Sequence, residues 1–281
     1  MLRAVRRYIK FHIQAFFDLY SEVLLRSDKR LFALLFNLRS FLTSTSTRIR
    51  WKEEAFLICD NEISGFQYKI RHQRQCNMAY QRGVRQRADL LAHQYFLNQI
   101  NFKDGDVFLD CGANVGDLKI WFELNGIDIE YVGFEPSPVE YSLLRENVSP
   151  SVVHNVGLWN TDGELVFYVS SQGADSSLVE PGNYDRKIVT RVSRLENYIH
   201  QPIKCVKLEA EGAEPEIISG LGNKTEMIEY IAADLGPERG RERASTLVPV
   251  TNQLFEMGFE LIDIRHKRVC ALYRNKNFNL G

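Results

Sequence analysis

The segment that most clearly suggests chemistry is "FLDCGANVGD", residues 108–117. It places a carboxylate, Asp110, directly after an apolar run, then Gly112 and Gly116, and then a second carboxylate, Asp117. Glycines let a backbone turn tightly and approach a ligand closely. Two carboxylates beside such a turn suit a ligand with a positively charged amino group. The spacing therefore predicts a binding turn for a cationic small molecule.

Two other kinds of nucleotide-binding loop do not fit this segment. When the second glycine of the dinucleotide fingerprint G-x-G-x-x-G is set on Gly112, its first and third glycines fall on Asp110 and Val115. No Gly-Lys-Ser/Thr follows, and the charge of Asp110 would repel a triphosphate. These mismatches exclude an NAD-type fingerprint and a P-loop.

A second charged group lies about a hundred residues later, in "IKCVKLEAEG". Strand alternation would place Lys207, Glu209 and Glu211 on one face. Charges crowded on one face are costly to bury unless they pair or react, which favours a functional role. Asp234, at the end of "IEYIAAD", is expected to face the same crevice. The candidate base is Glu209, Glu211 or Asp234. Lys207 would set their charge state.

The order of elements predicts how these two groups meet. Apolar strands alternate with helical stretches, in the order strand 107–110, helix 115–125, strand 130–135, helix 138–147 and strand 152–158. This βαβαβ order implies a parallel sheet with helices on both faces. Ligands of such sheets bind at the carboxyl ends of the strands near the switch point. The last two strands, "FELIDIRH" and "RVCALYRN", are expected to form an antiparallel hairpin.

Three ordered motifs resemble those of S-adenosylmethionine-dependent methyltransferases, and within them the FkbM-like family. They are "FLDCGANVGD", "GFEPSP" (133–138) and "VKLEAEGAEPEIISGL" (206–221). The resemblance covers about residues 103 to 274. It implies an α/β class I methyltransferase fold of Rossmann-like type, with a mostly parallel seven-stranded sheet that ends in the antiparallel hairpin. It also implies S-adenosyl-L-methionine as the cofactor.

The resemblance implies roles for a set of cofactor-binding residues. They are Asp110, Gly112, Asn114, Gly116, Asp117, Glu135, Pro136, Ser137, Asn155 and Val156. The acids and backbone of the first motif would hold the amino acid part, and Glu135 would bind the ribose hydroxyls. Pro136 and Ser137 would shape the turn, while Asn155 and Val156 would border the adenine. An acid at a helix N-terminus is the alternative interpretation of Glu135.

Further sequence features concern the part of the site where the acceptor is expected to react. A Ser-Ser-Leu element of the family is matched by residues 176–178, in a long loop that is expected near the cofactor or acceptor. In the family the position of Glu209 is usually Asp, and the extra methylene argues against a tight metal site. No metal ligands are predicted. Glu214 falls in the first turn of a helix, where an acid is favourable to the helix dipole.

The expected activity is methyl transfer to a hydroxyl, with a sugar of a glycan, polysaccharide or glycoconjugate as acceptor. The residues themselves do not select a sugar over a lipid or polyketide hydroxyl, so those remain alternatives. A non-catalytic cofactor-binding or scaffolding protein with this fold is another. A nucleic acid partner is not expected.

Composition indicates the class of protein and its cellular compartment. The 281 residues, 44% hydrophobic and 25% charged, describe a globular chain with one full core and an accessory segment. The first fifty residues carry ten Lys or Arg and three acids, whereas the whole chain has a net charge of -1. Five cysteines form no CxxC pair, which argues for a reducing compartment and against a structural zinc site. A cytoplasmic location is therefore expected.

The N-terminal segment reads as two amphipathic helices. Apolar residues from Val5 to Leu24 recur at helical spacing, and "SDK" at 27–29 offers a cap for a second helix through "LFALLFNLRSFL". Charged residues interrupt both, so no run approaches the roughly 20 residues that span a bilayer. The helices are expected to pack on the main domain or on a second copy, or else to lie on the inner membrane surface.

Three segments are therefore expected along the chain. They are the helical extension 1–50, with "STST" at 44–47 as a linker, a lead-in hairpin and helix at 51–102, and the methyltransferase domain at 103–281. Within the lead-in helix, Leu90, Leu91, Tyr95 and Phe96 are expected to face inward.

Overall fold

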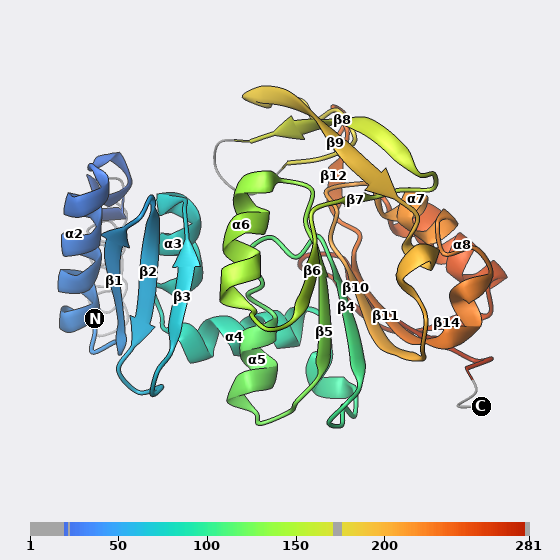
Figure 1. Cartoon of the computed structure of the whole chain (residues 1–281), viewed down its shortest axis with the longest axis horizontal. Helices are drawn as coiled ribbons and strands as arrows, with labels where there is room; N and C mark the ends of the chain where they lie inside the picture. Colours follow the sequence, from blue (N-terminus) through green and yellow to red (C-terminus); the bar gives the residue numbers. More distant parts are fainter. Residues whose placement is uncertain (1–19, 22, 171–175, 279–281) are drawn as a thin grey trace, which may run out of the picture. The chain divides into compact units, whose positions relative to one another are not determined.

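The computed structural model describes residues 20–278 except residue 22 and residues 171–175. The first predicted helix, from Val5 to Leu24, thus lies largely outside the described residues. The chain divides into two compact units, Met1–Val84 and Arg85–Gly281, each with its own sheet and helices (Figure 1). Helix 29–42 packs on the strand that follows it, so these elements share one unit across residue 50. The three segments expected from the sequence stay a prediction.

The first unit has a three-stranded antiparallel sheet in the order β1-β2-β3. Its elements are α2 (Lys29–Leu42), β1 (Thr47–Lys52), β2 (Ala55–Asp60), β3 (Gln67–Ile70) and α3 (Gln73–Tyr80). The predicted cap of α2 is confirmed, because the Asp28 carboxylate accepts hydrogen bonds from the backbone N–H groups of Arg30 and Leu31 (2.9 and 3.1 Å). β1 begins at Thr47, inside the expected linker.

Helix α2 is fixed to this sheet by apolar packing and by one amide. Phe32 and Phe36 are fully buried, and the Phe32 ring centroid lies 4.9 Å from that of Phe56 on β2. Asn37 covers the free edge of β1, since its amide nitrogen donates to the Ile49 carbonyl (2.9 Å) and its oxygen accepts from the Ile49 N–H (2.8 Å). The Asn37 amide thus pairs two backbone groups that an edge strand would otherwise leave open.

The second unit has a seven-stranded sheet in the order β14-β15-β11-β10-β4-β5-β6. The strands are β4 (Val107–Cys111), β5 (Glu130–Phe134), β6 (Val152–His154), β10 (Ile203–Leu208), β11 (Ile228–Asp234), β14 (Phe259–Arg265) and β15 (Cys270–Asn275). All neighbouring strands from β11 to β6 are parallel, and β15 is antiparallel to both β11 and β14. The predicted fold class, with its terminal antiparallel hairpin, is confirmed.

Helices cover both faces of this sheet and give it two apolar cores. They are α4 (Val84–Gln94), α5 (Lys119–Leu124), α6 (Pro138–Asn147), α7 (Glu214–Ser219) and α8 (Leu247–Glu256). Side chains of α4, α5 and α6 share one core, and those of α7 and α8 share the other. The expectation for α4 is wrong at Leu90, which is 52% exposed. The buried face of α4 runs through Leu91 and Tyr95, one turn apart, and Leu90 points away from it.

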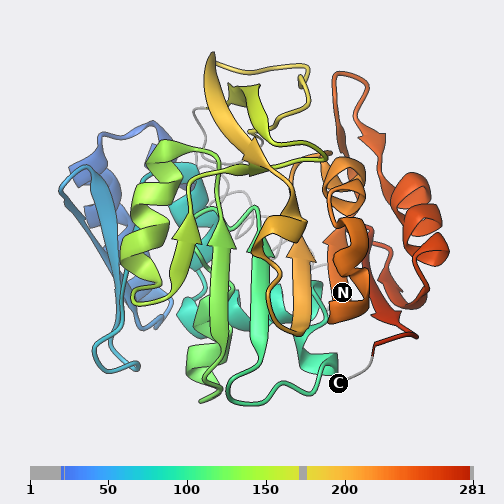
Figure 2. The same cartoon turned by 45° about the vertical axis from the view of Figure 1, so that its right-hand side comes forward.

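The expected strand 152–158 is divided between two sheets. β6 ends at His154, and β7 (Gly157–Leu158) joins β8 (Gly163–Val169) and β9 (Arg186–Ser193) in a separate sheet of order β7-β9-β8. Asn155 explains the break, because its amide nitrogen donates to the carbonyls of Glu135 and Pro136 (2.9 and 3.1 Å). In Figure 2 this smaller sheet lies beyond the arrowheads of the parallel strands.

Replacing Asn37 with alanine should destabilise the first unit by about 1–3 kcal/mol, because the Ile49 N–H and carbonyl lose their partner. Leu34→Ala on the same helix is the matched control, since Leu34 is 65% exposed and should change stability by less than about 0.5 kcal/mol. Denaturant unfolding measures both. Equal effects of the two substitutions would show that the amide bridge contributes nothing.

Candidate functional site

The switch point of the large sheet lies between β4 and β10. From β4 the chain builds β5 and β6 on one side and then returns to build β10 and β11 on the other. Lys207 pairs in register with Asp110, and Leu208 with Cys111. The carboxyl ends of these two parallel strands therefore bring both charged motifs to the place where such sheets bind ligands.

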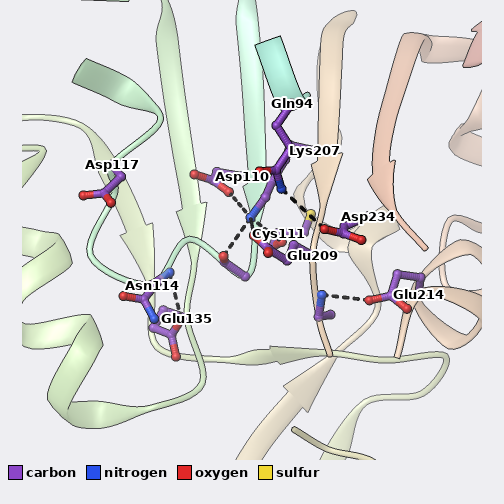
Figure 3. A network of polar contacts seen from close by, with 12 residues as sticks. Gln94, Asp110, Cys111, Asn114, Asp117, Glu135, Lys207, Glu209, Glu214 and Asp234 are labelled. Atoms are coloured by element: carbon purple, nitrogen blue, oxygen red, sulfur yellow. Dashed lines mark hydrogen bonds and ion pairs between the residues drawn. The ribbon is translucent and has the colours of Figure 1, made fainter. Parts of the chain in front are cut away.

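A buried ion pair joins the two strands at this point. The Lys207 Nζ lies 3.0 Å from Asp110 Oδ1, and the two side chains are 3% and 2% exposed (Figure 3). The Tyr131 hydroxyl donates to the other oxygen of Asp110 (2.7 Å), and Lys207 Nζ donates to the Gly112 carbonyl (2.8 Å). Burial alone would lower the pKa of Lys207, but the charges of Asp110 and Glu209 outweigh it and raise that pKa. Lys207 therefore stays charged.

Both Asp110 oxygens thus have partners within the protein, and its predicted contact with the cofactor's ammonium group stays a prediction. The predicted role of Asp117 in holding the cofactor also stays a prediction. Its carboxylate accepts two hydrogen bonds from the Arg87 guanidinium of α4 (2.9 and 3.0 Å) and is nearly buried.

The loop after β4 turns through Gly112, with φ of +80°. A Cβ atom built on Gly112 would lie 1.8 Å from the Glu209 carbonyl oxygen. The Glu209 N–H also donates to the Cys111 carbonyl (3.1 Å). The closest neighbour of this glycine is therefore the end of β10, where the sequence had suggested a ligand. Asn114 and Gly116 continue the turn with φ of +51° and +91°.

Glu135 forms a second polar group, directly after β5. Its two oxygens accept hydrogen bonds from the backbone N–H groups of Asn114 (2.9 Å) and Ser137 (2.8 Å). Burial raises its pKa to about 8, although the Ser137 N–H partly offsets this. Each carboxylate oxygen has two acceptor sites, so both retain the capacity to accept a further bond. Two residues are predicted to border the adenine. The Asn155 amide donates a hydrogen bond to the Glu135 carbonyl, and Val156 is buried in the apolar core.

A third group surrounds Arg268, which lies in the turn between β14 and β15. Its guanidinium lies 3.1 Å from the Asp234 carboxylate, 3.4 Å from Glu209 and 3.6 Å from Glu238. Glu209 is also 3.5 Å from the Lys207 Nζ. The structure therefore brings together Lys207, Glu209 and Asp234, as predicted, and joins them through a cation that the motifs did not indicate.

The three carboxyl groups around Arg268 differ in their pKa. Burial would raise the pKa of Glu209, but the charges of Lys207 and Arg268 outweigh it and lower that pKa. Burial and the charge of Glu209 raise the pKa of Asp234. Burial and the charge of Asp234 raise the pKa of Glu238 to about 7. At neutral pH the group thus contains an ionised acid, Glu209, beside acids that hold a proton more readily.

The predicted placement of Glu211 is wrong. β10 ends at Leu208, so strand alternation does not reach Glu211, which adopts a left-handed conformation with φ of +50°. Its carbonyl accepts a hydrogen bond from the Ser177 hydroxyl (2.8 Å), which ties the predicted Ser-Ser-Leu element to this loop. Glu209 is one residue past β10, but its N–H still bonds to the Cys111 carbonyl of β4 and its carboxylate lies 3.5 Å from Lys207, so it remains at the edge of the sheet. Glu211 belongs to the turn that follows.

Glu214 holds that turn in place. Its buried carboxylate accepts hydrogen bonds from the N–H groups of Ala210 (2.8 Å) and Gly212 (3.2 Å), and from the Thr246 hydroxyl (3.0 Å). Glu214 is thus a structural residue of the loop, which agrees with its expected place in the first turn of α7.

Sequence reasoning missed Arg268 and Glu238. No local sequence pattern marks Arg268. Its position depends on the pairing of Asp234 in β11 with Cys270 in β15, which brings the hairpin turn close to Asp234. Glu238 lies in the short strand β12 (Pro237–Arg239) and has no motif of its own. Among the residues that the structure describes, no group of three or more His, Cys, Asp or Glu side chains is arranged to hold a metal ion.

Gly112→Ala should prevent folding or greatly destabilise the protein, because the new methyl group would overlap the Glu209 backbone. Gly126→Ala is the matched control. It has a similar φ of +66° but nothing within 4 Å of the added Cβ, so only backbone strain of about 1–2 kcal/mol is expected. Soluble yield and thermal unfolding measure both. Comparable stability of the two variants would contradict the close approach of the two strand ends.

Comparison with known proteins adds a family to this geometry. The chain matches the model of the methyltransferase FkbM domain over residues 110–255. No curated protein matches. Similar solved structures include a candidate rRNA-methylase from Clostridium thermocellum, with 14% identity over 68% of this chain and 97% of that one and a TM-score of 0.43.

Two more solved structures are similar to a comparable degree. An S-adenosylmethionine-dependent methyltransferase from Aquifex aeolicus has 13% identity over 68% of this chain and 95% of that one, with a TM-score of 0.38. The N-terminal domain of human METTL16, in complex with S-adenosylhomocysteine, has 13% identity over 70% of this chain and 71% of that one, with a TM-score of 0.39.

The matched region covers more than half of the 281 residues. It contains every residue of the three charged groups apart from Arg268. The chain therefore belongs to the FkbM family of methyltransferases, and its cofactor is S-adenosylmethionine.

Proposed function

We propose that this protein methylates a hydroxyl oxygen, with a sugar of a glycan, polysaccharide or glycoconjugate as the acceptor. Family membership supports the methyl transfer, and the resemblance of the motifs supports the sugar. The observation that carries the choice of oxygen is the placement of Glu209, an ionised carboxylate between Lys207 and Arg268 at the carboxyl edge of the sheet.

The residues at this edge fit the cofactor. Near the switch point, the carboxylates of Asp110, Glu209 and Asp234 outnumber the cations Lys207 and Arg268, and Glu238, with a pKa of about 7, adds a partial negative charge. This surplus of negative charge suits a ligand with an ammonium and a sulfonium group. Glu135 keeps acceptor capacity on both oxygens, which suits the two hydroxyls of a ribose. When bound, the cofactor supplies an activated methyl group.

We infer the holding roles from this fit. Asp110, Asp117 and the backbone of residues 112–116 hold the amino acid part, Glu135 holds the ribose, and Asn155 and Val156 border the adenine. Asp110 also contributes indirectly to cofactor binding. Its ion pair with Lys207, and the hydrogen bond from Lys207 to the Gly112 carbonyl, fix the position of the loop.

Glu209 is the group best placed to receive the proton that the acceptor hydroxyl must lose. Its side chain is 26% exposed, whereas that of Lys207 is 3% exposed, so Glu209 can contact a ligand that Lys207 cannot reach. The proton would pass from the hydroxyl oxygen to a Glu209 carboxylate oxygen. Lys207 and Arg268 orient that carboxylate and keep it ionised beforehand. Asp234, whose carboxylate is held by Arg268 and by Gln94 (3.4 Å), is the second candidate.

The state of the cysteines bears on the compartment in which the protein acts. All five cysteines are free, and four of them are buried, which supports a reducing compartment and a cytoplasmic location. The proposed partner is a hydroxyl-bearing acceptor rather than a nucleic acid.

Glu209→Gln should lower methyl transfer to the acceptor by about 10²–10⁴-fold, because the amide cannot take up the proton. Its affinity for S-adenosylhomocysteine should change by less than about threefold, since Glu209 is assigned no direct contact with the cofactor and S-adenosylhomocysteine has no sulfonium charge. Transfer of labelled methyl groups to polysaccharide, glycolipid and polyol acceptors measures the first, and calorimetry the second. Glu226→Gln, at an exposed glutamate, is the control.

Full activity of Glu209→Gln would remove it as the base and leave Asp234 to be tested by Asp234→Asn. Labelling of nitrogen or carbon atoms alone in all acceptors would contradict the proposed hydroxyl chemistry.

Cofactor binding at pH 7 should release a proton from Glu135. Its pKa of about 8 leaves it mostly protonated before binding, and a ribose diol that donates two hydrogen bonds favours the carboxylate, which lowers that pKa and expels the proton. Calorimetric titration with S-adenosylhomocysteine in phosphate and in Tris would detect this as a buffer-dependent enthalpy. Glu135→Gln should bind more weakly and show no such dependence. A buffer-independent enthalpy for the unsubstituted protein would contradict the ribose role.

A further inference from the structure

Helix α2 of the first unit has two apolar faces. One packs on the sheet through Phe32 and Phe36. The other consists of five large side chains that recur every three or four residues, and we name it the outer stripe. The outer stripe is Leu31, Leu34, Leu38, Phe41 and Leu42, which are 43%, 65%, 48%, 72% and 70% exposed. This spacing places all five on one side of the helix.

The helix cannot turn to hide the outer stripe. Phe32 lies against Phe56, and the Asn37 amide is bonded to both backbone groups of Ile49, so the rotation of α2 about its axis is set. Single exposed apolar residues are common on protein surfaces, but a contiguous apolar stripe along a fixed helix marks an interaction surface.

We propose that the outer stripe binds the surface of an anionic lipid bilayer. Charge selects this partner. The helix Lys29–Leu42 has no acidic residue, and two of its three basic residues, Lys29 and Arg30, are at least partly exposed, whereas Arg39 is buried. Residues 1–19 contain four basic residues and one acidic one. Packing a second copy of α2, or residues 1–19, on the outer stripe would bring like charges together. Anionic headgroups instead attract these charges, and acyl chains accept Leu and Phe side chains of any shape.

The helix would lie along the membrane rather than cross it. α2 has 14 residues and a length of about 21 Å, which is shorter than the hydrocarbon core. None of the described helices is both long and apolar enough to span a bilayer. An interfacial helix needs only one apolar face for the lipid, and the opposite face of α2 remains free to hold the sheet. This inference does not depend on the proposed reaction.

Vesicle flotation of the full chain tests the inference. The vesicles consist of phosphatidylcholine alone or of phosphatidylcholine with phosphatidylglycerol. The protein should bind the anionic vesicles, and added salt should weaken this binding. The triple variant Leu34→Gln, Leu38→Gln, Phe41→Gln should bind at least about tenfold more weakly, because three lipid-facing side chains are lost. All three side chains are exposed in the structure, so thermal unfolding should show that this variant folds.

The matched control replaces three exposed apolar residues of the second unit. Val189, Val248 and Phe255 are 67%, 66% and 51% exposed, and their change to Gln should leave vesicle binding within about twofold. Equal binding by the stripe variant and the unsubstituted protein would overturn the proposal.

Two other occupants predict different results. A dimer in light scattering that dissociates in the stripe variant, with no vesicle binding, would assign the outer stripe to a second copy. Vesicle binding that appears only after residues 1–19 are deleted would assign it to that segment. Either result would overturn the membrane proposal.

Discussion

The buried ion pair between Asp110 and Lys207 is the interaction on which the rest of the site depends. It joins the two strands that flank the switch point, one from each half of the sheet. Removing two charges from water costs several kcal/mol per ion, so such a pair persists only where further hydrogen bonds complete it. Tyr131 supplies one to Asp110, and the Gly112 carbonyl accepts one from Lys207. The pair thereby fixes the loop after β4 as well as the end of β10.

The other groups are arranged outward from this pair. Lys207 contacts Glu209, and Glu209 contacts Arg268. Arg268 in turn contacts Asp234 at the end of β11 and Glu238 beyond it. Glu135 stands apart from this chain of charges, but Asn114 connects it to the same loop. One loop therefore lies between Glu135, which we propose for the ribose, and Glu209, which we propose for proton transfer. This arrangement brings together two charged motifs that are separated by about a hundred residues in the sequence.

Sequence alone predicted the sheet, its terminal hairpin and the meeting of the two motifs. These features follow from local patterns, namely apolar runs that end in charged residues and alternate with helical stretches. The sequence could not predict features that depend on contacts between distant residues. Arg268 reaches Asp234 only because β15 pairs with β11, and β6 ends early because Asn155 bonds the loop after β5. Glu211 illustrates a third limit. Alternation holds only while the strand lasts, and β10 ends three residues before it.

A double-mutant cycle at Asp110 and Lys207 tests the central claim most directly. The substitutions Asp110→Asn and Lys207→Met nearly preserve size and remove one charge each, and denaturant unfolding gives the free energy of each variant. Each single substitution should destabilise the protein by about 3–5 kcal/mol, since it leaves an uncompensated buried charge. The double variant should lose far less than the sum of the two single losses. Additive losses would contradict the account, because they would show that the two charges do not support each other at the switch point.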